Sequence, residues 1–205
     1  WLDMARYSAE ALMELARRKI TLADILTQKS LANAIAVHAA CGGSTNLLLH
    51  VPAVAHAAGL VRPTVEDWRD ANRRISRFVD VLPNGPVNHP TVQLYLAGGV
   101  PEIMWHLREA GAIHGDCMTV IAQTWDEILD AWHASPRRAA MRQLLQQRDG
   151  VDPDAVIIPP ARAKAQGLTS TVAFPIGNLC PEGSVIKATA IDPSVIDADG
   201  VFRHT

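Results

Sequence analysis

The fold depends on one stretch of the sequence, Cys41-Gly42-Gly43-Ser44-Thr45-Asn46, which Leu47-Leu48-Leu49-His50 follow directly. Paired glycines allow a backbone to turn sharply and to approach a ligand closely. Ser, Thr and Asn are preferred at helix N-termini, and such a terminus, with its free N–H groups and partial positive charge, suits an anionic ligand. The stretch therefore predicts a sharp turn that opens a helix, with either a ligand site or ordinary capping at the turn.

Cys41 has two interpretations. A thiolate beside a helix N-terminus has a lowered pKa and can hold a metal. The alternative is a buried, unreactive cysteine that precedes an ordinary capped helix. The local sequence leaves both open.

Composition excludes several classes of function. The chain has 205 residues, a formal net charge of −2, 48% hydrophobic residues and 20% charged residues. This balance offers no charge pattern for nucleic acid or for an anionic membrane, and no apolar stretch is long enough to cross a bilayer. Three widely spaced cysteines predict no disulfide framework and favour a reducing compartment. We expect a cytoplasmic protein with no nucleic-acid or membrane partner.

The first residues indicate a piece of a longer protein. The chain starts at Trp1 and enters a helical pattern by Met4. Charged residues within the first twenty positions argue against a signal peptide. We therefore expect an internal fragment, in which any site shared with other segments is incomplete.

Apolar periodicity and capping residues predict helices over most of the first 150 residues. The expected ranges are 4–18, a short helix from Thr21, 30–40, 46–58, 64–75, 91–96, 102–110, 124–132 and 137–148. The last of these carries Arg137, Arg138, Arg142 and Arg148, and we expect its basic face to be solvated.

Strands are expected mainly after Gly150. Residues 117–122 read as a buried strand, and the short runs 156–158, 170–174 and 184–191 read as further strands. Five prolines between positions 150 and 182 favour a domain change in that region. The pattern is that of a mixed α/β chain, helix-rich first and strand-rich later.

Several polar clusters allow a functional or a structural interpretation. His114-Gly115-Asp116-Cys117 offers three metal-ligand types, but adjacent ligands without a second cluster favour a turn over a metal site. His50 and His89 are candidate site residues, the first in the helix after the paired glycines and the second in a Pro/Gly-rich loop, where functional residues are common. Surface or turn positions are the alternative for both, and Cys180 reads as structural.

Several stretches in the same order along the chain resemble one enzyme family. They are Asn33-Ala34-Ile35-Ala36-Val37, Gly42-Gly43-Ser44-Thr45-Asn46 with Leu48-Leu49-His50, Ala97-Gly98-Gly99-Val100-Pro101, the pattern Leu-x-x-Ala-Gly-x-x-His-Gly-Asp-Cys-x-Thr-Val over 107–120, and Pro181-Glu182-Gly183-Ser184-Val185-Ile186-Lys187. Together they resemble the IlvD/Edd dehydratase family. Within it, residues 82–91 and 187–194 are most similar to the YjhG/YagF branch, the D-xylonate dehydratase type.

The resemblance implies a hydro-lyase. Family members remove water from 2,3-dihydroxy acids and aldonates with an iron–sulfur cluster, [2Fe–2S] or [4Fe–4S], and an adjacent Mg²⁺. An iron with an open coordination position can act as a Lewis acid on the departing C3 hydroxyl. The implied reaction converts a sugar acid such as D-xylonate to its 2-keto-3-deoxy acid.

The resemblance also implies roles for particular residues. Cys41 would be a cluster ligand and the metal-binding residue of this chain. Ser44, Thr45 and Asn46 would line the cluster or substrate pocket, and His50 and His89 are further candidates. The other cluster ligands, the Mg²⁺ ligands and the catalytic base would lie outside the chain, so this fragment alone is expected to be inactive.

The implied fold is α/β. Residues 1–160 would form part of a helix-rich, three-layer cluster-binding domain, and residues 161–205 would form the linker and first strands of a β-barrel-like domain. Family members are homodimers or homotetramers.

Two alternatives stay open. One is another activity of the family, either dihydroxy-acid dehydratase of branched-chain amino-acid synthesis or phosphogluconate dehydratase, although no phosphate-binding cluster of Arg or Lys is visible in the sequence. The other is a non-catalytic scaffold that kept the fold and lost the cluster.

Overall fold

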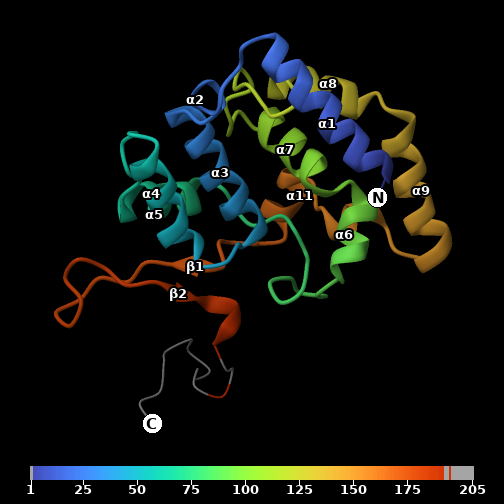
Figure 1. Ribbon diagram of the computed structural model, residues 1–205. Helices are drawn as coiled ribbons and strands as arrows, with labels where there is room; N and C mark the ends of the chain where they lie inside the picture. Colours follow the sequence, from blue (N-terminus) through green and yellow to red (C-terminus); the bar gives the residue numbers. More distant parts are fainter. Residues whose placement is uncertain (1, 192–193, 195–205) are drawn as a thin grey trace.

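A computed structural model describes residues 2–191 and 194 of the chain (Figure 1). Helices dominate this part of the chain. They are α1 (Leu2–Arg17), α2 (Leu22–Ile25), α3 (Gln28–Cys41), α4 (Leu47–Ala57), α5 (Val65–Arg74), α6 (Thr91–Ala97), α7 (Gly99–Glu109), α8 (Trp125–His133), α9 (Pro136–Asp149), α10 (Pro153–Val156) and α11 (Pro160–Ala165). The other regular elements are strands β1 (Val172–Ala173) and β2 (Ile186–Lys187) and the 3₁₀-helix η1 (Ala188–Ala190).

The expected abundance of helix is confirmed, whereas sheet is sparse. Within the described residues, β1 and β2 form one antiparallel two-stranded sheet, with Val172 opposite Lys187 and Ala173 opposite Ile186. The β-barrel-like domain and a boundary at residue 160 stay predictions. Residues 192–193 and 195–205 of the second expected domain lie outside the described part.

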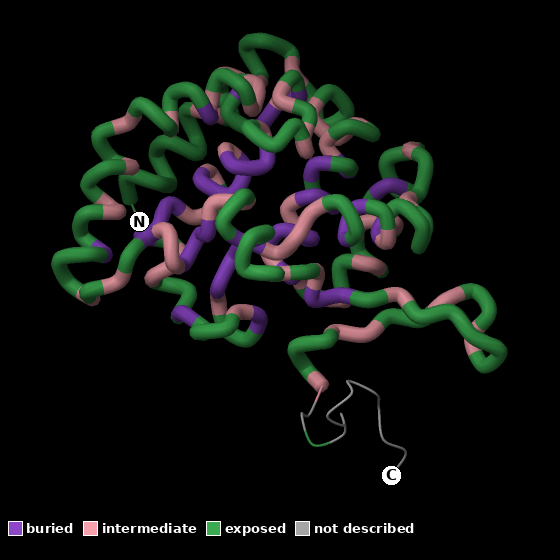
Figure 2. Tube along the Cα trace, turned by 180° about the vertical axis from the view of Figure 1, so that it is seen from behind, coloured by how far each residue is buried: buried purple, intermediate pink, exposed green. Residues whose placement is uncertain are grey.

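The hydrophobic core lies around α3 and α7. Ala36 and Ala40 of α3 pack with Ile103 and Leu107 of α7, and all four are at most 3% exposed. Small side chains on α3 allow the neighbouring elements to approach closely, and each large apolar side chain buried here stabilises the fold by about 1.5–3 kcal/mol. Figure 2 shows these buried segments enclosed by exposed outer helices.

Helix α1 lies on the outside of the molecule. None of its residues is buried, and Leu12 is 65% exposed. No helix in the described ranges is both long and apolar enough to cross a membrane.

Local sequence signals place most helix ends correctly. The Thr64 N–H donates to Asp67 Oδ2 at 2.7 Å, and Thr124 forms the equivalent bond with Glu127 at 2.7 Å, so both helices start with a capping box. Gly59, expected to end the helix before it, has φ +68°, the left-handed conformation that glycine adopts without strain.

Two expected strands are wrong. Residues 117–122 form turns, because Ala122 adopts φ +60° and Thr119 Oγ1 donates to the Gln123 carbonyl at 2.7 Å, which folds the chain back on itself. Val156 ends the short helix α10, and the two residues after it make a single bridge, between Val79 and Ile157. Residues 156–158 are buried, whereas Val120 and Ile121 of the other segment are 64% and 45% exposed. A short apolar run therefore does not distinguish a strand from a turn.

The expectation of a solvated basic face on α9 is confirmed for Arg137 and Arg148, which are exposed, but it is wrong for Arg138 and Arg142. Arg138 donates to both oxygens of Glu102, at 2.7 and 2.6 Å, and Arg142 lies 3.4 Å from the same carboxylate. Glu102 is 1% exposed and also accepts from Trp132 Nε1 at 2.9 Å. Burial raises the pKa of Glu102, but the hydrogen bonds from Arg138 and Trp132 outweigh it and hold this pKa below its usual value. The network joins α7, α8 and α9 through a paired charge.

Candidate functional site

Three segments that are far apart in the sequence meet on one side of the molecule. They are the turn after α3 (residues 42–44), the loop before α6 (residues 82–89) and the segment after β2 (residues 187–189), here called the three-segment site (Figure 1). Ala188 N donates to the Thr171 carbonyl at 2.8 Å, and Thr171 in turn contacts Gly42. Thr189 Oγ1 donates to Asn84 Oδ1 at 3.1 Å, which joins the third segment to the second.

The paired glycines pass between two side chains of the protein itself. Gly42 ends α3 with φ +60° and ψ +48°. A Cβ atom on Gly42 would lie within 3.0 Å of Thr171 Oγ1, and one on Gly43 would lie within 3.0 Å of His38 Cδ2. Close internal packing therefore explains both glycines, whereas the sequence suggested the approach of a ligand.

The predicted pocket residues after the glycines remain accessible. Ser44 and Asn46 are exposed and Thr45 is half-buried. Asn46 precedes α4 with helical φ −59° and ψ −28°, and its side chain makes no capping bond. Ser44 Oγ accepts from the Asn46 N–H at 3.3 Å. The helix opens without using the Asn46 amide, which leaves that group free to meet a ligand.

His38 forms one wall of the turn. Its Nε2 donates to the Ser44 carbonyl at 3.0 Å, so the hydrogen lies on Nε2 and Nδ1 carries a lone pair. The ring lies edge-on to Trp68, with centroids 4.9 Å apart, and Nδ1 is buried with no partner in the described part of the chain. Burial lowers the pKa of His38, the bond to Ser44 opposes this, and the nearby Lys187 cation lowers the pKa further. His38 is therefore a neutral acceptor.

The second segment is a loop built around a buried carboxylate. Asp80 is 1% exposed and accepts the N–H groups of Val87 at 3.0 Å and Asn88 at 2.7 Å. Gly85 lies against Asp80, where a Cβ would overlap the carboxylate. Nothing in the sequence pattern singled out Asp80, because a carboxylate reveals its role only when its backbone partners are known.

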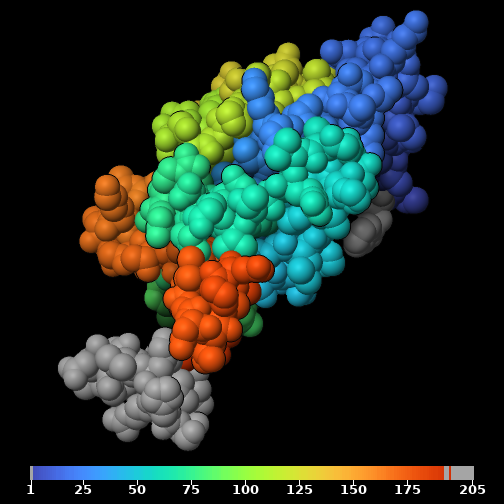
Figure 3. Space-filling model, turned by 90° about the vertical axis from the view of Figure 1, so that its left-hand side faces the viewer, coloured from blue at the N-terminus to red at the C-terminus, as the bar shows by residue number. Residues whose placement is uncertain are grey.

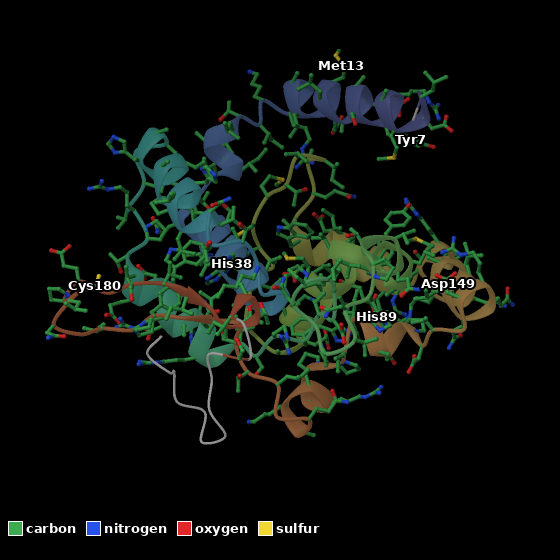
Figure 4. The ribbon with its side chains drawn as sticks, turned by 90° about the horizontal axis from the view of Figure 1, so that it is seen from below. Tyr7, Met13, His38, His89, Asp149 and Cys180 are labelled. Carbon is green, nitrogen blue, oxygen red and sulfur yellow. The ribbon has the colours of Figure 1, made fainter. Side chains whose placement is uncertain are left out.

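His89 lies buried at the end of this loop. His89 Nδ1 donates to Gln93 Oε1 at 2.7 Å, and Gln93 Nε2 donates to Asp149 Oδ2 at 3.1 Å. Figure 4 shows His89 and Asp149 on the same side of His38. His89 Nε2 is buried and has no partner among the described residues, so His89 stays a candidate.

His50 lies exposed on the first turn of α4, and its side chain forms no hydrogen bond within residues 2–191 and 194. Its N–H donates to the carbonyl of the candidate Asn46 at 3.1 Å, which places the two residues on one face of the helix. The role of His50 stays a prediction.

Cys41 lies in surroundings that disfavour a thiolate. It is the last residue of α3, packs against the hydrophobic core and is half-buried. Burial raises the pKa of its thiol to about 12, and the C-terminal end of a helix carries partial negative charge. No group of three or more His, Cys, Asp or Glu side chains able to hold a metal occurs in the described part of the chain. The donors in this part therefore do not by themselves fit an iron–sulfur cluster, and Cys41 as a ligand stays a prediction.

The other two cysteines occupy structural positions. Cys117 is 6% exposed, next to a turn fixed by Asn33, which exchanges two hydrogen bonds with His114 at 2.9 and 2.7 Å. This supports the turn interpretation of residues 114–117. Cys180 Sγ donates to the Gly183 carbonyl at 2.9 Å near the tip of the β1–β2 hairpin, far from His38 in Figure 4.

A cavity of about 760 Å³ lies outside the three-segment site, between α3, α5 and the C-terminal end of α7, where Ile35, Asp70 and Ala110 line it. Of the residues considered as ligands from the sequence, His114 lines it, whereas Cys41, Ser44, His50 and His89 do not. Size alone does not locate chemistry, so the meeting of the three motifs is the better guide.

The family model of the dihydroxy-acid/6-phosphogluconate dehydratase N-terminal domain matches residues 2–128, a range that includes the first two segments of the site. The chain belongs to this dehydratase family. Two similar proteins from Escherichia coli (strain K12) are both called D-xylonate dehydratase. YagF is 62% identical over 205 residues, and YjhG is 56% identical over 204 residues.

More distant family members carry a different name. A dihydroxy-acid dehydratase from Ralstonia nicotianae is 38% identical over 195 residues, 95% of this chain. The chain spans 31% of the length of YagF and of YjhG, and 32% of the Ralstonia protein. The dehydratase similarity thus covers the whole chain and about a third of each relative.

Substitution of Gly42 tests the close contact with Thr171. Gly42→Ala places a Cβ in a left-handed conformation, which costs about 1–2 kcal/mol, and adds an overlap that costs about 1–3 kcal/mol more. Gly59→Ala is the matched control, because Gly59 has φ +68° with open space around it. We expect Gly42→Ala to lower the melting temperature of the intact protein clearly more than Gly59→Ala; equal shifts would contradict the packing argument.

Iron content tests the assignment of Cys41. Because the family resemblance makes Cys41 a cluster ligand, we expect Cys41→Ser in the intact, anaerobically purified protein to lower both its iron content and its activity. Wild-type iron and sulfide together with full activity would overturn the assignment of Cys41 as a ligand.

Proposed function

We propose that the protein containing this chain is a sugar-acid dehydratase that converts D-xylonate to its 2-keto-3-deoxy acid. One observation carries the proposal: two relatives named D-xylonate dehydratase match the full chain at 62% and 56% identity. Relatives named dihydroxy-acid dehydratase, from Ralstonia nicotianae and from a Polaromonas species, match at 38% and 37%. This difference favours an aldonate over a branched-chain dihydroxy acid.

The proposed reaction requires the site to support a proton transfer and the loss of water. The proton on C2 is removed, the C3 hydroxyl leaves as water, and the resulting enol tautomerises to the 2-oxo acid. When bound, an iron–sulfur cluster and Mg²⁺ would supply the Lewis acidity for the departing hydroxyl and for the carboxylate. We infer both cofactors from the family, with most or all of their ligands outside this chain.

The residues of this chain would bind and orient the sugar acid. Ser44 and Thr45 offer hydroxyls at the turn, and Asn46 offers an uncommitted amide. Neutral His38 keeps the turn in place through the Ser44 carbonyl. These groups are of the kind that hydrogen-bond the hydroxyls of a polyol chain. We further propose a cytoplasmic homodimer or homotetramer with a small-molecule substrate.

Product formation tests the proposal. The intact protein, purified without oxygen, is assayed for 2-oxo acid with D-xylonate, D-gluconate and 2,3-dihydroxyisovalerate side by side. We expect D-xylonate to give the highest kcat/KM. Preference for 2,3-dihydroxyisovalerate would replace the proposed substrate, and absence of both turnover and iron–sulfur cluster would support the non-catalytic scaffold.

A further inference from the structure

Lys187 is a lysine that faces the interior of the molecule. It lies directly opposite Val172 in the antiparallel β1–β2 pair. Residues opposite each other in such a pair project from the same face of the sheet, and Val172 is 3% exposed. The side chain of Lys187 therefore projects toward the body of the protein. Figure 3 shows the hairpin, in orange-red, packed below α5 and α4.

The hairpin holds Lys187 beside the turn after α3. Its neighbour Ala188 donates to the Thr171 carbonyl, and the Thr171 side chain contacts Gly42. The ammonium lies close enough to the His38 ring to lower the pKa of that histidine. Lys187 is thus fixed at the three-segment site by the backbone register and by the contact between Thr171 and Gly42.

The Lys187 ammonium has no counter-ion in the described part of the chain. No ion pair joins it to Asp or Glu there, whereas Lys29, at the surface, pairs with Asp116. Burial lowers the pKa of Lys187, so the folded chain disfavours its charge. Burying an unpaired cation destabilises the folded state unless an anion binds beside it.

A neutral acceptor belongs to the same site as this cation. His38 Nδ1 is buried, carries a lone pair and has no partner among the described residues. A cation beside an acceptor matches a carboxylate that carries a hydroxyl on the adjacent carbon. Sugar acids have this arrangement at C1 and C2.

We propose that Lys187 binds the carboxylate of the sugar acid. The proposal rests on the proposed function and adds to it the residue that recognises the acidic end of the substrate. The ammonium of a lysine carries three hydrogen-bond donors that rotate freely, unlike the rigid guanidinium of an arginine. The bound carboxylate can therefore contact other groups of the site at the same time.

Kinetics of the intact, cofactor-loaded protein with D-xylonate test the proposal. Lys187→Met removes the charge and keeps much of the chain length, Lys187→Arg keeps the charge, and Lys164→Met, an exposed lysine on α11, is the matched control. Because a charge-assisted hydrogen bond is lost, we expect KM to rise about tenfold or more in Lys187→Met, with part of the affinity restored in Lys187→Arg. The control should match the wild type.

The melting temperature and calorimetric binding of D-xylonate are measured on the same samples. An unchanged KM in Lys187→Met would overturn the proposal. If the melting temperature of that variant also fell, Lys187 would be assigned to an ion pair within the protein. If the wild type binds D-xylonate without turnover, the dissociation constants replace KM in this comparison. A weaker constant in Lys187→Met supports the proposal, and an unchanged one overturns it. If the wild type neither binds nor turns over D-xylonate, the proposed function fails and the role of Lys187 fails with it.

Discussion

The contact of Gly42 and Gly43 with Thr171 and His38 is the constraint on which the rest of the site depends. No side chain larger than hydrogen fits at either glycine without displacing its neighbour. The contact brings residue 171 against the end of α3, although about 130 positions separate them. Since β1 begins one residue later, the β1–β2 pair follows, and with it the position of Lys187. A substitution at the turn would therefore disturb all three segments.

Two buried carboxylates support this arrangement. Asp80 organises the loop before α6 through two backbone N–H groups, and Asn84 at the tip of that loop accepts from Thr189. Glu102 joins α7 to α9 through Arg138, below the same core. Each carboxylate is satisfied by several donors, which is the condition for burying a charge without loss of stability. The site is thus held by polar contacts over a core of small and branched apolar residues.

The sequence predicted local structure well and long-range structure poorly. Helix ends at Thr64 and Thr124 were correct because a capping box involves residues only three positions apart. The expected solvation of Arg138 on α9 was wrong because its partner Glu102 lies 36 positions away. The strand expected at 117–122 was wrong because a short apolar run occurs in turns as well as in strands.

In the candidate site too, local features were predicted from the sequence and long-range contacts were not. The turn at Gly42 and the loop that ends at His89 were identified from motifs, and the structure brings both segments to one place. The reason for the glycines was not predictable, because Thr171 and His38 become neighbours only in the fold. Lys187 was part of a recognised motif, yet only the register opposite Val172 shows that it faces inward. The surroundings of Cys41 were equally invisible, since its burial depends on the packed core.

A crystal structure of the intact protein with D-xylonate bound tests the central claim most directly. The account predicts the sugar acid at the three-segment site, with its carboxylate within hydrogen-bonding distance of Lys187 Nζ and its hydroxyls toward the turn at Ser44. A sugar acid bound elsewhere, with Lys187 paired to a carboxylate of the protein, would contradict it.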